Sequence, residues 1–390
     1  MKILFSIANL KIGGAQIVAL RLARKLQELG HRVDIYDHFP DDRNNGMVDN
    51  NFPNARLFSV EESRWKRKII WKINALFQLI SPTFSFFQKK NKSRFKSLIK
   101  TKKYDIIHSH MFDSDWIVSQ TVESMAPNQL VLSMHGCYEE RIARFGIDKM
   151  KLKIETIFNL FGKISFLTEN NLHFLELLSL KHVPKLEKIY NGIDLRGKKL
   201  YDNKKRGQNP FIFGLVARGV KEKGWAETIQ AAIQLSEKTN FKFEVHLVGD
   251  SPFLQGLKNK YQYHKYIHFL GYCNDPTVVM KNFDVGLLPS YTESLPTSII
   301  EYMALGIPVI ASNVGEIRNM LIDLKTQHSA GLIIPLKNGK PDISQLQMAL
   351  AKLISDEKTY NKLKESTKHL ILQFDMQKCT DNYIDFYNAK

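Results

Sequence analysis

Cysteine is scarce in this chain of 390 residues. Cys137, Cys273 and Cys379 lie far apart, and none belongs to a Cys-x-x-Cys pair or to a Cys/His ligand spacing. This argues against a disulfide scaffold and against a structural zinc site built on paired cysteines, and favours a reducing cytoplasm. The first ten residues hold only a short apolar run before a Gly-Gly loop, which predicts a buried first strand rather than a signal peptide.

Acidic residues are absent between Arg64 and Lys103, a stretch that contains 13 Lys and Arg residues. The formal net charge of the whole chain is +17, so this tenth of the chain carries most of the excess. A strongly basic balance of this kind indicates a polyanionic partner, which can be nucleic acid, anionic lipid or a phosphorylated small molecule.

The same stretch lacks a long uninterrupted apolar run, because Lys72, Asn74 and Pro82 break it, and this argues against a membrane-spanning helix. Its cations alternate with aromatic residues at Trp65, Trp71, Phe77, Phe84, Phe86, Phe87 and Phe95. Such a mixture is typical of a helix at a bilayer surface, so we predict that 64–103 docks on an anionic membrane. The alternative is an ordinary basic helix pair with its aromatics in the core. No nucleic-acid-binding signature accompanies the segment, and we expect no nucleic-acid partner.

Short β-branched runs alternate with helical stretches in both halves of the chain, and the length fits two domains. The strands are expected at residues 2–8, 32–36, 105–109, 130–134, 163–167, 187–190, 211–216, 243–248, 267–269, 285–288 and 308–311. A polar segment over 191–210 reads as the linker, and 343–387 as helix. The pattern predicts an α/β fold of two Rossmann-like, doubly wound domains. Ligands in such sheets bind beyond the carboxyl ends of the strands, so we expect the two domains to face a cleft that holds the site.

The most informative motif begins at Tyr291 and reads YTESLPTSIIEYMALGIPVIA. Glu293 follows a predicted buried strand, and a helix is expected to start near Pro296, a residue favoured at the first helical position. The free N–H groups of a helix start suit a phosphate. Glu293 can accept hydrogen bonds from sugar hydroxyls, and Glu301, further along the helix, can reach a ribose diol.

Several motifs in order make the chain resemble the retaining GT-B glycosyltransferases of family 4, whose signature is Glu-x7-Glu in this context. They are IGGAQ, DIIHSH, SMHG, YNGID, VARGVKEKG, HLVGD and ESLPTSIIEYMALGIPVIAS. The resemblance implies a metal-independent transferase that uses a nucleotide sugar and keeps the anomeric configuration of the donor. It places Glu293 against the transferred sugar and Glu301 on the ribose. Ser294, Leu295 and Thr297, which lie between them, are assigned to donor binding as well.

Two cations, Arg218 and Lys223, follow the first strand of the second half in VARGVKEKG. Fixed cations stabilise the charge that develops on a departing nucleoside diphosphate, and the family carries an Arg/Lys pair here. Two positions depart from the family pattern. Ala217 stands where Gly is usual, and Ser251 replaces the second Gly of a Gly-x-Gly, which leaves contacts to the nucleobase at that loop open.

In the first half, Gly13 and Gly14 join the first strand to the first helix, where the backbone can approach an anionic ligand closely. By resemblance this loop contacts the diphosphate or the acceptor, and His135 contacts the donor sugar. His108 and His110 are two positions apart on a strand, so they should share one face, and we expect both to be structural.

Asp113-Ser-Asp115 matches the Asp-x-Asp motif of metal-dependent glycosyltransferases of another fold. Here it falls at a predicted helix start, where Asp is a favoured cap. We therefore assign no metal ligands and expect no cofactor beyond the nucleotide-sugar substrate.

Taken together, residues 1–194 are predicted to form the acceptor- and membrane-facing domain and 195–370 the nucleotide-sugar domain, with a helix over 371–390 returning to the first. The resemblance predicts a hexosyltransferase that uses a UDP-sugar and a lipid-linked or saccharide acceptor in cell-surface polysaccharide or glycolipid synthesis. It would be cytoplasmic and peripheral to the inner face of the cell membrane. Two alternatives remain: another GT-B enzyme, such as a nucleotide-sugar epimerase or a phosphorylase, and a non-catalytic membrane-binding protein.

Overall fold

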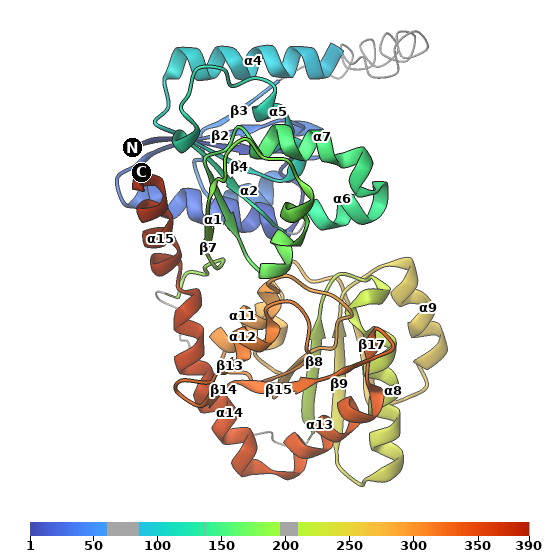
Figure 1. Cartoon of the computed structure of the whole chain (residues 1–390). Coiled ribbons are helices and arrows are strands. Elements are labelled where there is room, and N and C mark those ends of the chain that lie inside the picture. Colours follow the sequence, from blue (N-terminus) through green and yellow to red (C-terminus); the bar gives the residue numbers. More distant parts are fainter. Residues whose placement is uncertain (61–85, 136, 196–209, 390) are drawn as a thin grey trace. The chain divides into compact units, whose positions relative to one another are not determined.

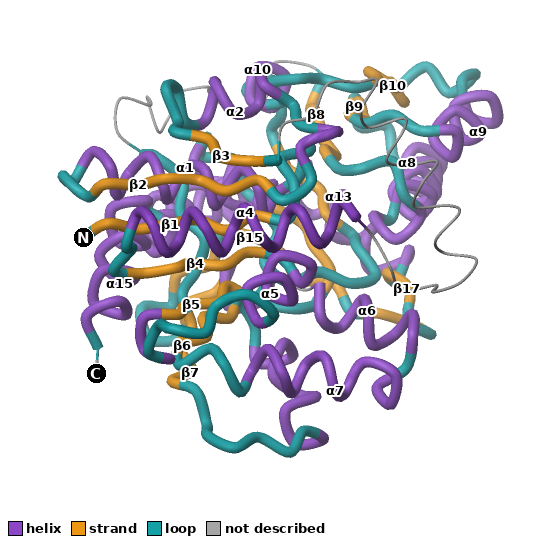
Figure 2. The backbone as a smooth tube through the Cα atoms, turned by 90° about the horizontal axis from the view of Figure 1, so that it is seen from above, coloured by secondary structure: helices purple, strands orange, loops and turns teal. Residues whose placement is uncertain are grey.

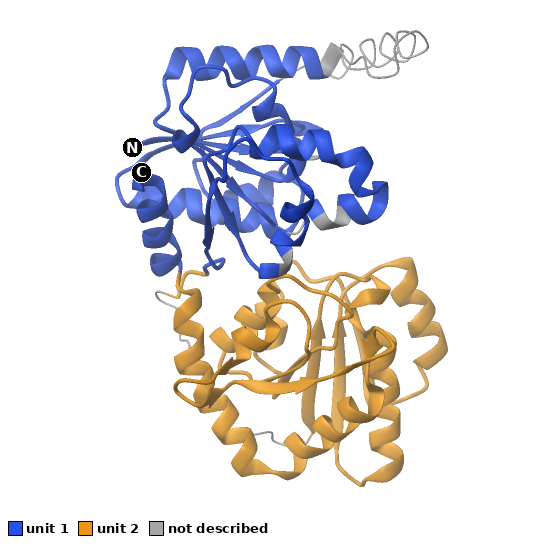
Figure 3. Cartoon of the chain, in the orientation of Figure 1, with its two compact units in different colours: residues 1–192, 376–390 blue, residues 193–375 orange. Residues whose placement is uncertain are grey.

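Short apolar strands and amphipathic helices alternate along the chain as the sequence predicts, and they assemble into two parallel sheets covered by helices (Figures 1 and 2). The computed structural model describes residues 1–60, 86–135, 137–195 and 210–389. The chain divides into two compact units, which Figure 3 colours separately. Unit 1 comprises Met1–Gly192 and Met376–Lys390, and unit 2 comprises Ile193–Asp375.

Unit 1 contains a seven-stranded parallel sheet in the order β3-β2-β1-β4-β5-β6-β7. The strands are β1 Lys2–Ile7, β2 Arg32–Asp37, β3 Leu57–Ser59, β4 Ile106–His110, β5 Leu130–Ser133, β6 Lys163–Phe166 and β7 Lys185–Lys188. Every residue of β4, β5 and β6 is buried, as expected for parallel strands with helices on both faces. The strand order reverses between β1 and β4, and in such sheets ligands bind beyond the carboxyl ends at this point.

Two helical layers cover this sheet. The larger helices are α1 Gly14–Glu28, α2 Asn45–Asn51, α4 Phe86–Lys102, α5 Phe112–Ser119, α6 Cys137–Phe145, α7 Ile147–Phe158 and α15 Met376–Asn388. Helices α1, α2 and α15 share one apolar core with β1, and α4, α5 and α7 share another with β4 and β5. Short 3-10 turns occupy Pro40–Asp42, Pro127–Gln129 and Glu169–Leu177.

Unit 2 contains a six-stranded parallel sheet in the order β10-β9-β8-β11-β12-β15, the order of a doubly wound Rossmann-like fold. Its strands are β8 Phe211–Val216, β9 Phe243–Val248, β10 Ile267–Gly271, β11 Val285–Leu288, β12 Val309–Ser312 and β15 Gly331–Ile334. Its helices are α8 Trp225–Lys238, α9 Pro252–Tyr261, α10 Thr277–Met280, α11 Thr297–Ala304, α12 Ile317–Leu321, α13 Ile343–Ser355 and α14 Glu357–Leu370. Two antiparallel pairs, β13 Ile322–Asp323 with β14 His328–Ser329 and β16 Leu336–Lys337 with β17 Lys340–Pro341, and 3-10 turns at Lys221–Lys223 and Ile371–Phe374 complete the unit. The predicted fold class, two doubly wound α/β sheets, is confirmed.

Tyr302 fixes helix α11 on the sheet of unit 2. Its fully buried ring packs against Gly286 so closely that a Cβ at that glycine would lie 2.4 Å from the ring. Its hydroxyl donates to the carbonyl of Gly214 at 3.1 Å and accepts from the N–H of Val216 at 3.0 Å. The helix is thereby held against β8 and β11.

Helix α15 is anchored in unit 1 by buried polar contacts. The hydroxyl of Tyr383 lies 2.8 Å from Ser133 Oγ, and that of Tyr387 lies 2.7 Å from His108 Nδ1. Lys163 Nζ donates to the carbonyl of Tyr387 at 2.8 Å. These contacts tie the last helix to β4, β5 and β6, across more than 200 residues of sequence.

The basic stretch is described only in part, because Trp65, Trp71, Phe77 and Phe84 lie outside the described residues. Helix α4 buries Asn91, Phe95 and Ile99, one residue per turn, against the sheet. Phe95 therefore belongs to the core, and its interpretation as an interfacial aromatic is wrong. Lysines and arginines at positions 89, 90, 94, 96 and 100 are exposed on the outer side. In the described part of the chain, no helix combines the length and apolarity needed to cross a membrane.

Candidate active site

The carboxylate of Glu293 is held by two donors in the loop that follows β11. Lys223 Nζ donates to Glu293 Oε1 at 2.5 Å, and Ser290 Oγ donates to the same oxygen at 2.7 Å. The side chains of Lys223 and Glu293 are 14% and 9% exposed. Within the described residues, the other oxygen, Oε2, has no hydrogen-bond partner. The carboxylate is thus fixed in position with one oxygen available to a ligand.

Close packing between two loops places Lys223 beside Glu293. Gly224 has φ 73°, and a Cβ there would lie 1.9 Å from the carbonyl oxygen of Pro289, so only glycine fits. The N–H of Tyr291 donates to the carbonyl of Glu222 at 2.8 Å, and the Tyr291 hydroxyl donates to Glu227 Oε1 at 2.6 Å. These contacts join the carboxyl ends of β8 and β11.

Helix α11 begins at Thr297, and Pro296 is its N-cap rather than its first helical residue, so the predicted helix start is corrected by one position. No side chain from the described part of the chain caps this end. The N–H groups of Thr297 and Ser298 have no acceptor among the described residues, so they are available to an anion. Glu301 lies one turn further along the helix and is half-buried.

Ser294 and Leu295 join Glu293 to this helix end. The carbonyl of Ser294 accepts the N–H of Glu316 at 2.9 Å. Gly315 has φ 53°, and a Cβ there would lie 2.2 Å from the carbonyl oxygen of Glu293. Leu295 is buried. The loop after β12 therefore packs against the Glu293 loop and restrains the backbone of the Glu293 loop.

Arg218 is exposed in the loop between β8 and the 3-10 turn that contains Lys223, and its guanidinium has no carboxylate partner in the described ranges of the chain. Its backbone is fixed instead, because Trp225 Nε1 donates to the carbonyl of Arg218 at 3.2 Å. Ser251, which departs from the family pattern, has a local role: its Oγ donates to the carbonyl of Gly219 at 2.6 Å and caps α9 by accepting the N–H of Leu254 at 3.1 Å.

In unit 1, Gly13 and Gly14 lie at the start of α1, beyond the carboxyl end of β1, and Gly14 is the first residue of the helix. Gly13 is the N-cap of α1 with an extended backbone, φ −174°. Gly14 is exposed, and a Cβ there would meet no atom within 4 Å. The fold itself does not require glycine at Gly14, so the open space is compatible with close approach of a ligand.

His135 follows β5 and lies next to the two histidines of β4. His135 Nε2 is 3.0 Å from His110 Nδ1, and the His108 and His110 rings lie 4.1 Å apart, on one face as predicted. Burial lowers the pKa of His135 to about 4 and lowers that of His108 and His110 well below 6.5. All three rings are therefore neutral at pH 7. His108 is also bonded to Ser133 Oγ at 2.7 Å, which makes it part of the interior network.

Asp113 and Asp115 do not cap a helix, and that interpretation is wrong. The N-cap of α5 is Met111, with φ 76° and no side-chain cap. Asp113 pairs with Arg141 at 2.6 Å, whereas Asp115 is buried and accepts the hydroxyl of Tyr138 at 2.8 Å. Burial raises the pKa of Asp115 to about 7. The two carboxylates therefore have separate protein partners.

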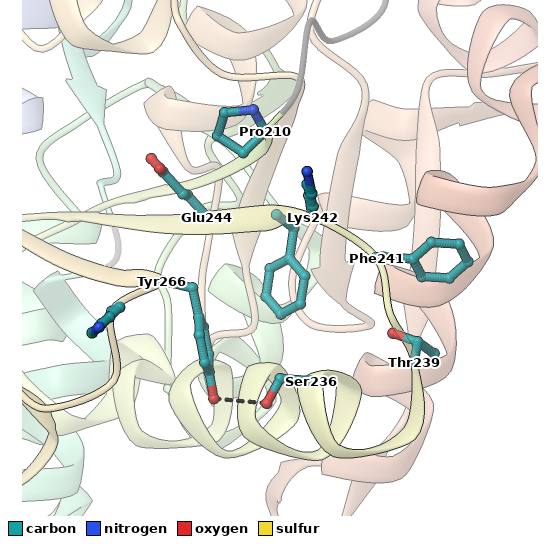
Figure 4. A pocket seen from close by; sticks show the side chains of 9 residues that line it. Pro210, Ser236, Thr239, Phe241, Lys242, Glu244 and Tyr266 are labelled. Carbon is teal, nitrogen blue, oxygen red and sulfur yellow. Dashed lines mark hydrogen bonds between the residues drawn. The ribbon is translucent and has the colours of Figure 1, made fainter.

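Sequence reasoning missed Ser290 and Tyr291 as supports of Glu293, although both lie in the same loop. It also missed a groove of about 270 Å³ near the amino ends of β9 and β10, where Tyr266 and Ser236 are bonded at 2.8 Å (Figure 4). None of the candidate residues named above lines this groove.

Two models of protein families match the chain, one in each half. The model described as "Glycosyltransferase Family 4" matches residues 12–196, and the one described as "Glycosyl transferases group 1" matches 198–370. An Escherichia coli UDP-Gal:alpha-D-GlcNAc-diphosphoundecaprenol alpha-1,3-galactosyltransferase is 28% identical over 74% of this chain and 76% of its own length. A Campylobacter jejuni N,N'-diacetylbacillosaminyl-diphospho-undecaprenol alpha-1,3-N-acetylgalactosaminyltransferase is 25% identical over 64% of this chain and 66% of its own.

Solved structures match over the full length. Alr3699/HepE from Anabaena, crystallised with UDP and glucose, superposes with a TM-score of 0.74 at 16% identity, covering 100% of both chains. WaaG, a glycosyltransferase involved in lipopolysaccharide biosynthesis, gives a TM-score of 0.65 at 15% identity, also covering 100% of both chains. The chain therefore belongs to glycosyltransferase family 4, the glycosyl transferases group 1, whose members are retaining enzymes with the GT-B fold.

Proposed function

We propose that this enzyme transfers a hexose from a UDP-sugar, with retention of configuration, to a lipid-linked saccharide during the synthesis of a cell-surface polysaccharide. The observation that carries the proposal is the Glu293 carboxylate, fixed through Oε1 by Lys223 and Ser290 next to the uncapped start of α11. These neighbouring loops bring together a carboxylate, which can bind sugar hydroxyls, with a cation and free N–H groups, which can bind phosphate. Such a set suits a sugar whose leaving group is a diphosphate.

Within unit 2, each donor group has a candidate partner. The exposed Arg218 guanidinium and Lys223 would neutralise the diphosphate, together with the N–H groups at Thr297. Glu293 Oε2 would accept a hydroxyl of the transferred sugar. Glu301 would hold the ribose diol of the nucleotide.

Within unit 1, the neutral His135 ring can exchange hydrogen bonds with a sugar hydroxyl, and the exposed Gly14 allows a ligand to approach the backbone. The start of α1, which has no side-chain cap at Gly13, offers N–H groups to an anionic part of the substrates. Unit 1 would thus contribute the acceptor side.

The substrates are inferred from the relatives. The Escherichia coli relative is named for UDP-Gal and an undecaprenol diphosphate acceptor, and the Campylobacter jejuni relative for an acceptor of the same lipid class. A Staphylococcus aureus relative, CapH, 26% identical over 57% of this chain and 63% of its own length, is named for capsular polysaccharide biosynthesis. A lipid-linked acceptor would place the enzyme at the cytoplasmic face of the membrane, where the exposed cations of α4 would meet anionic lipid.

The test begins with a thermal-shift screen of UDP- and GDP-sugars, because a specific donor raises the Tm by mass action. The stabilising donor is then incubated with and without an undecaprenyl diphosphate-linked saccharide. We expect release of nucleoside diphosphate that depends on the acceptor, and an α-configured product from an α-linked donor by NMR. If nucleoside diphosphate is released equally fast without acceptor, or if the donor sugar is epimerised, the enzyme has another GT-B activity and is not a transferase.

A further inference from the structure

Three side chains with metal-binding atoms meet on the sheet of unit 2, and none of them belongs to the candidate active site. Glu244 and His246 are two positions apart on β9, and His268 lies on the neighbouring strand β10, directly opposite His246 in the register. Alternate residues of a strand share a face, so all three side chains project from the same side of the sheet. Their ligand atoms all lie within 4.8 Å of one another.

The two imidazoles converge on a single carboxylate oxygen. His246 Nε2 lies 2.8 Å and His268 Nε2 lies 3.4 Å from Glu244 Oε2. The Nε2 of His268 is buried and makes no hydrogen bond within the described residues, although its side chain is 38% exposed. A buried ring nitrogen without a hydrogen-bond partner is costly unless another group satisfies it.

We propose that Glu244, His246 and His268 bind a divalent transition metal, with Zn²⁺ as the preferred ion. At Zn–N and Zn–O distances of about 2.0–2.1 Å, tetrahedral ligands are separated by about 3.3–3.4 Å. The His268–Glu244 pair already has this spacing, and the His246–Glu244 pair needs to open by only roughly 0.5 Å. Two imidazole nitrogens and one carboxylate oxygen suit Zn²⁺, Cu²⁺ or Ni²⁺, whereas Mg²⁺ and Ca²⁺ prefer oxygen ligands alone.

Neighbouring side chains restrain the three ligands, and the site remains accessible to solvent. The His246 ring packs edge-on against the buried Phe283 ring at 6.0 Å and against the His268 ring at 5.1 Å. The side chains of Glu244 and His268 are 31% and 38% exposed, so water can reach the ion and supply a fourth ligand. Figure 4 shows Glu244 projecting from its strand on the side opposite to Tyr266, Ser236 and helix α8.

The site would be a structural metal site that links β9 to β10, and not a catalytic one. Among the described strands, β10 is the edge of its sheet and is paired only with β9. Glu244 is the second of the six residues of β9, whereas ligands of such sheets bind beyond the carboxyl end, here after Val248. A metal bound to both strands would stabilise unit 2 without entering the chemistry, so this inference does not depend on the proposed function.

The test uses full-length protein without a histidine tag, after dialysis against a chelator. Zn²⁺ binding is measured by calorimetry, and Co²⁺ is added as a spectroscopic probe because tetrahedral Co²⁺ with protein ligands absorbs strongly in the visible. We expect one ion per chain, visible Co²⁺ bands, and a rise in Tm of roughly 2–4 °C with excess Zn²⁺.

His268→Gln at the exposed edge and the double variant His246→Gln/His268→Gln should weaken Zn²⁺ binding at least ~10-fold and abolish the Co²⁺ bands. The matched control is His328→Gln/His369→Gln, since those two rings also stack, at 4.2 Å, and this variant should bind as the wild type does. The Tm of each variant in chelator shows whether it folds. Absence of Co²⁺ bands in the wild type, or a Zn²⁺ affinity unchanged in His268→Gln, would overturn the proposal.

Discussion

Lys223 Nζ lies 2.5 Å from Glu293 Oε1, although the two residues are 70 positions apart in the sequence. Both side chains are largely buried, at 14% and 9% exposure. Burying an ion pair costs desolvation free energy. A second hydrogen bond, from Ser290 to the Glu293 carboxylate, offsets part of this cost. The arrangement fixes the orientation of Glu293 before any substrate binds, which is what an electrostatic role in catalysis requires.

We predict that Glu293→Ala lowers the turnover of sugar transfer by ~10²–10³-fold, the loss typical of a charged contact made in the transition state. The variant should remain folded, although Lys223 then loses its partner and the Tm falls. Turnover is measured at saturating donor and acceptor, and folding by circular dichroism. Wild-type turnover in the folded variant would remove Glu293 from the site.

Arg218→Ala should lower turnover by a similar ~10²–10³-fold with an unchanged Tm, because the Arg218 guanidinium is exposed and has no ion-pair partner among the described residues. Lys221→Ala is the matched control, since Lys221 is an exposed cation three residues further along the chain. Equal losses in both variants would indicate a general effect of charge and not a specific contact with the diphosphate.

Sequence and structure agree where the signal is local. Strand β11, the loop that carries Glu293 and helix α11 follow one another directly along the chain, so the sequence pattern predicts them. It does not predict the pairing of Lys223 with Glu293, because this pairing depends on the Tyr291–Glu222 and Gly224–Pro289 contacts between distant loops.

The errors have the same origin. Asp113 was expected to cap α5, but Met111 takes the N-cap position with a positive φ, which its residue type does not predict. The aromatic and basic pattern predicts that Phe95 is interfacial. In the structure Phe95 lies on the same buried face of α4 as Asn91 and Ile99, so it faces the core. Glu244 and His246 carried a weak signal, a Glu-x-His on one strand. Their relation to His268 required the register of β10 on β9.

We predict that EDTA leaves turnover unchanged when it is assayed well below the Tm, even if it lowers the Tm by removing a metal from β9 and β10. Arg218, Lys223 and the start of α11 supply positive charge for the diphosphate. The measurement compares initial rates with EDTA and with added Mg²⁺ or Mn²⁺. A strict requirement for added metal would return attention to Asp113 and Asp115, despite their contacts with Arg141 and Tyr138.

Stability should fall as the pH decreases from about 6.5 to 4. Burial lowers the pKa of His38 to about 3 and of His135 to about 4, and lowers that of His108 and His110 well below 6.5. In that range the unfolded chain binds more protons than the folded chain, so each histidine contributes stability that is complete above pH 6.5 and is lost toward its folded pKa.

Asp115 and Asp37 act in the opposite direction, because burial raises the pKa of Asp115 to about 7 and raises that of Asp37 above its usual value, and the contribution of each is lost as the pH rises. Four histidines outweigh these two carboxyl groups, and each group changes the free energy of unfolding by up to about 1.36 kcal/mol per pH unit. Urea unfolding at pH 7, 6 and 5, followed by circular dichroism, measures the sum. An equal midpoint at pH 7 and pH 5 would contradict neutral, buried histidines.

The basic segment gives the last prediction, which is that the protein binds anionic liposomes and that salt weakens this binding. Lys89, Lys90 and Lys100 are exposed on α4, whose opposite face is held to the sheet by Asn91 and Phe95. A negative bilayer attracts each nearby basic residue with about 1 kcal/mol, and screening acts over ~8 Å at physiological ionic strength.

Changing Lys89, Lys90 and Lys100 to Ser should therefore reduce partitioning onto anionic liposomes by up to ~100-fold, without loss of folding because none of the three side chains is buried. The matched control replaces Lys258, Lys265 and Lys281, three exposed lysines of unit 2, with Ser, and removes the same charge elsewhere. Flotation with neutral and anionic liposomes at low and high salt compares the three proteins. If both triple variants lose binding equally, the attraction comes from net charge and not from α4. If the wild type floats equally well with neutral liposomes, charge does not direct the docking.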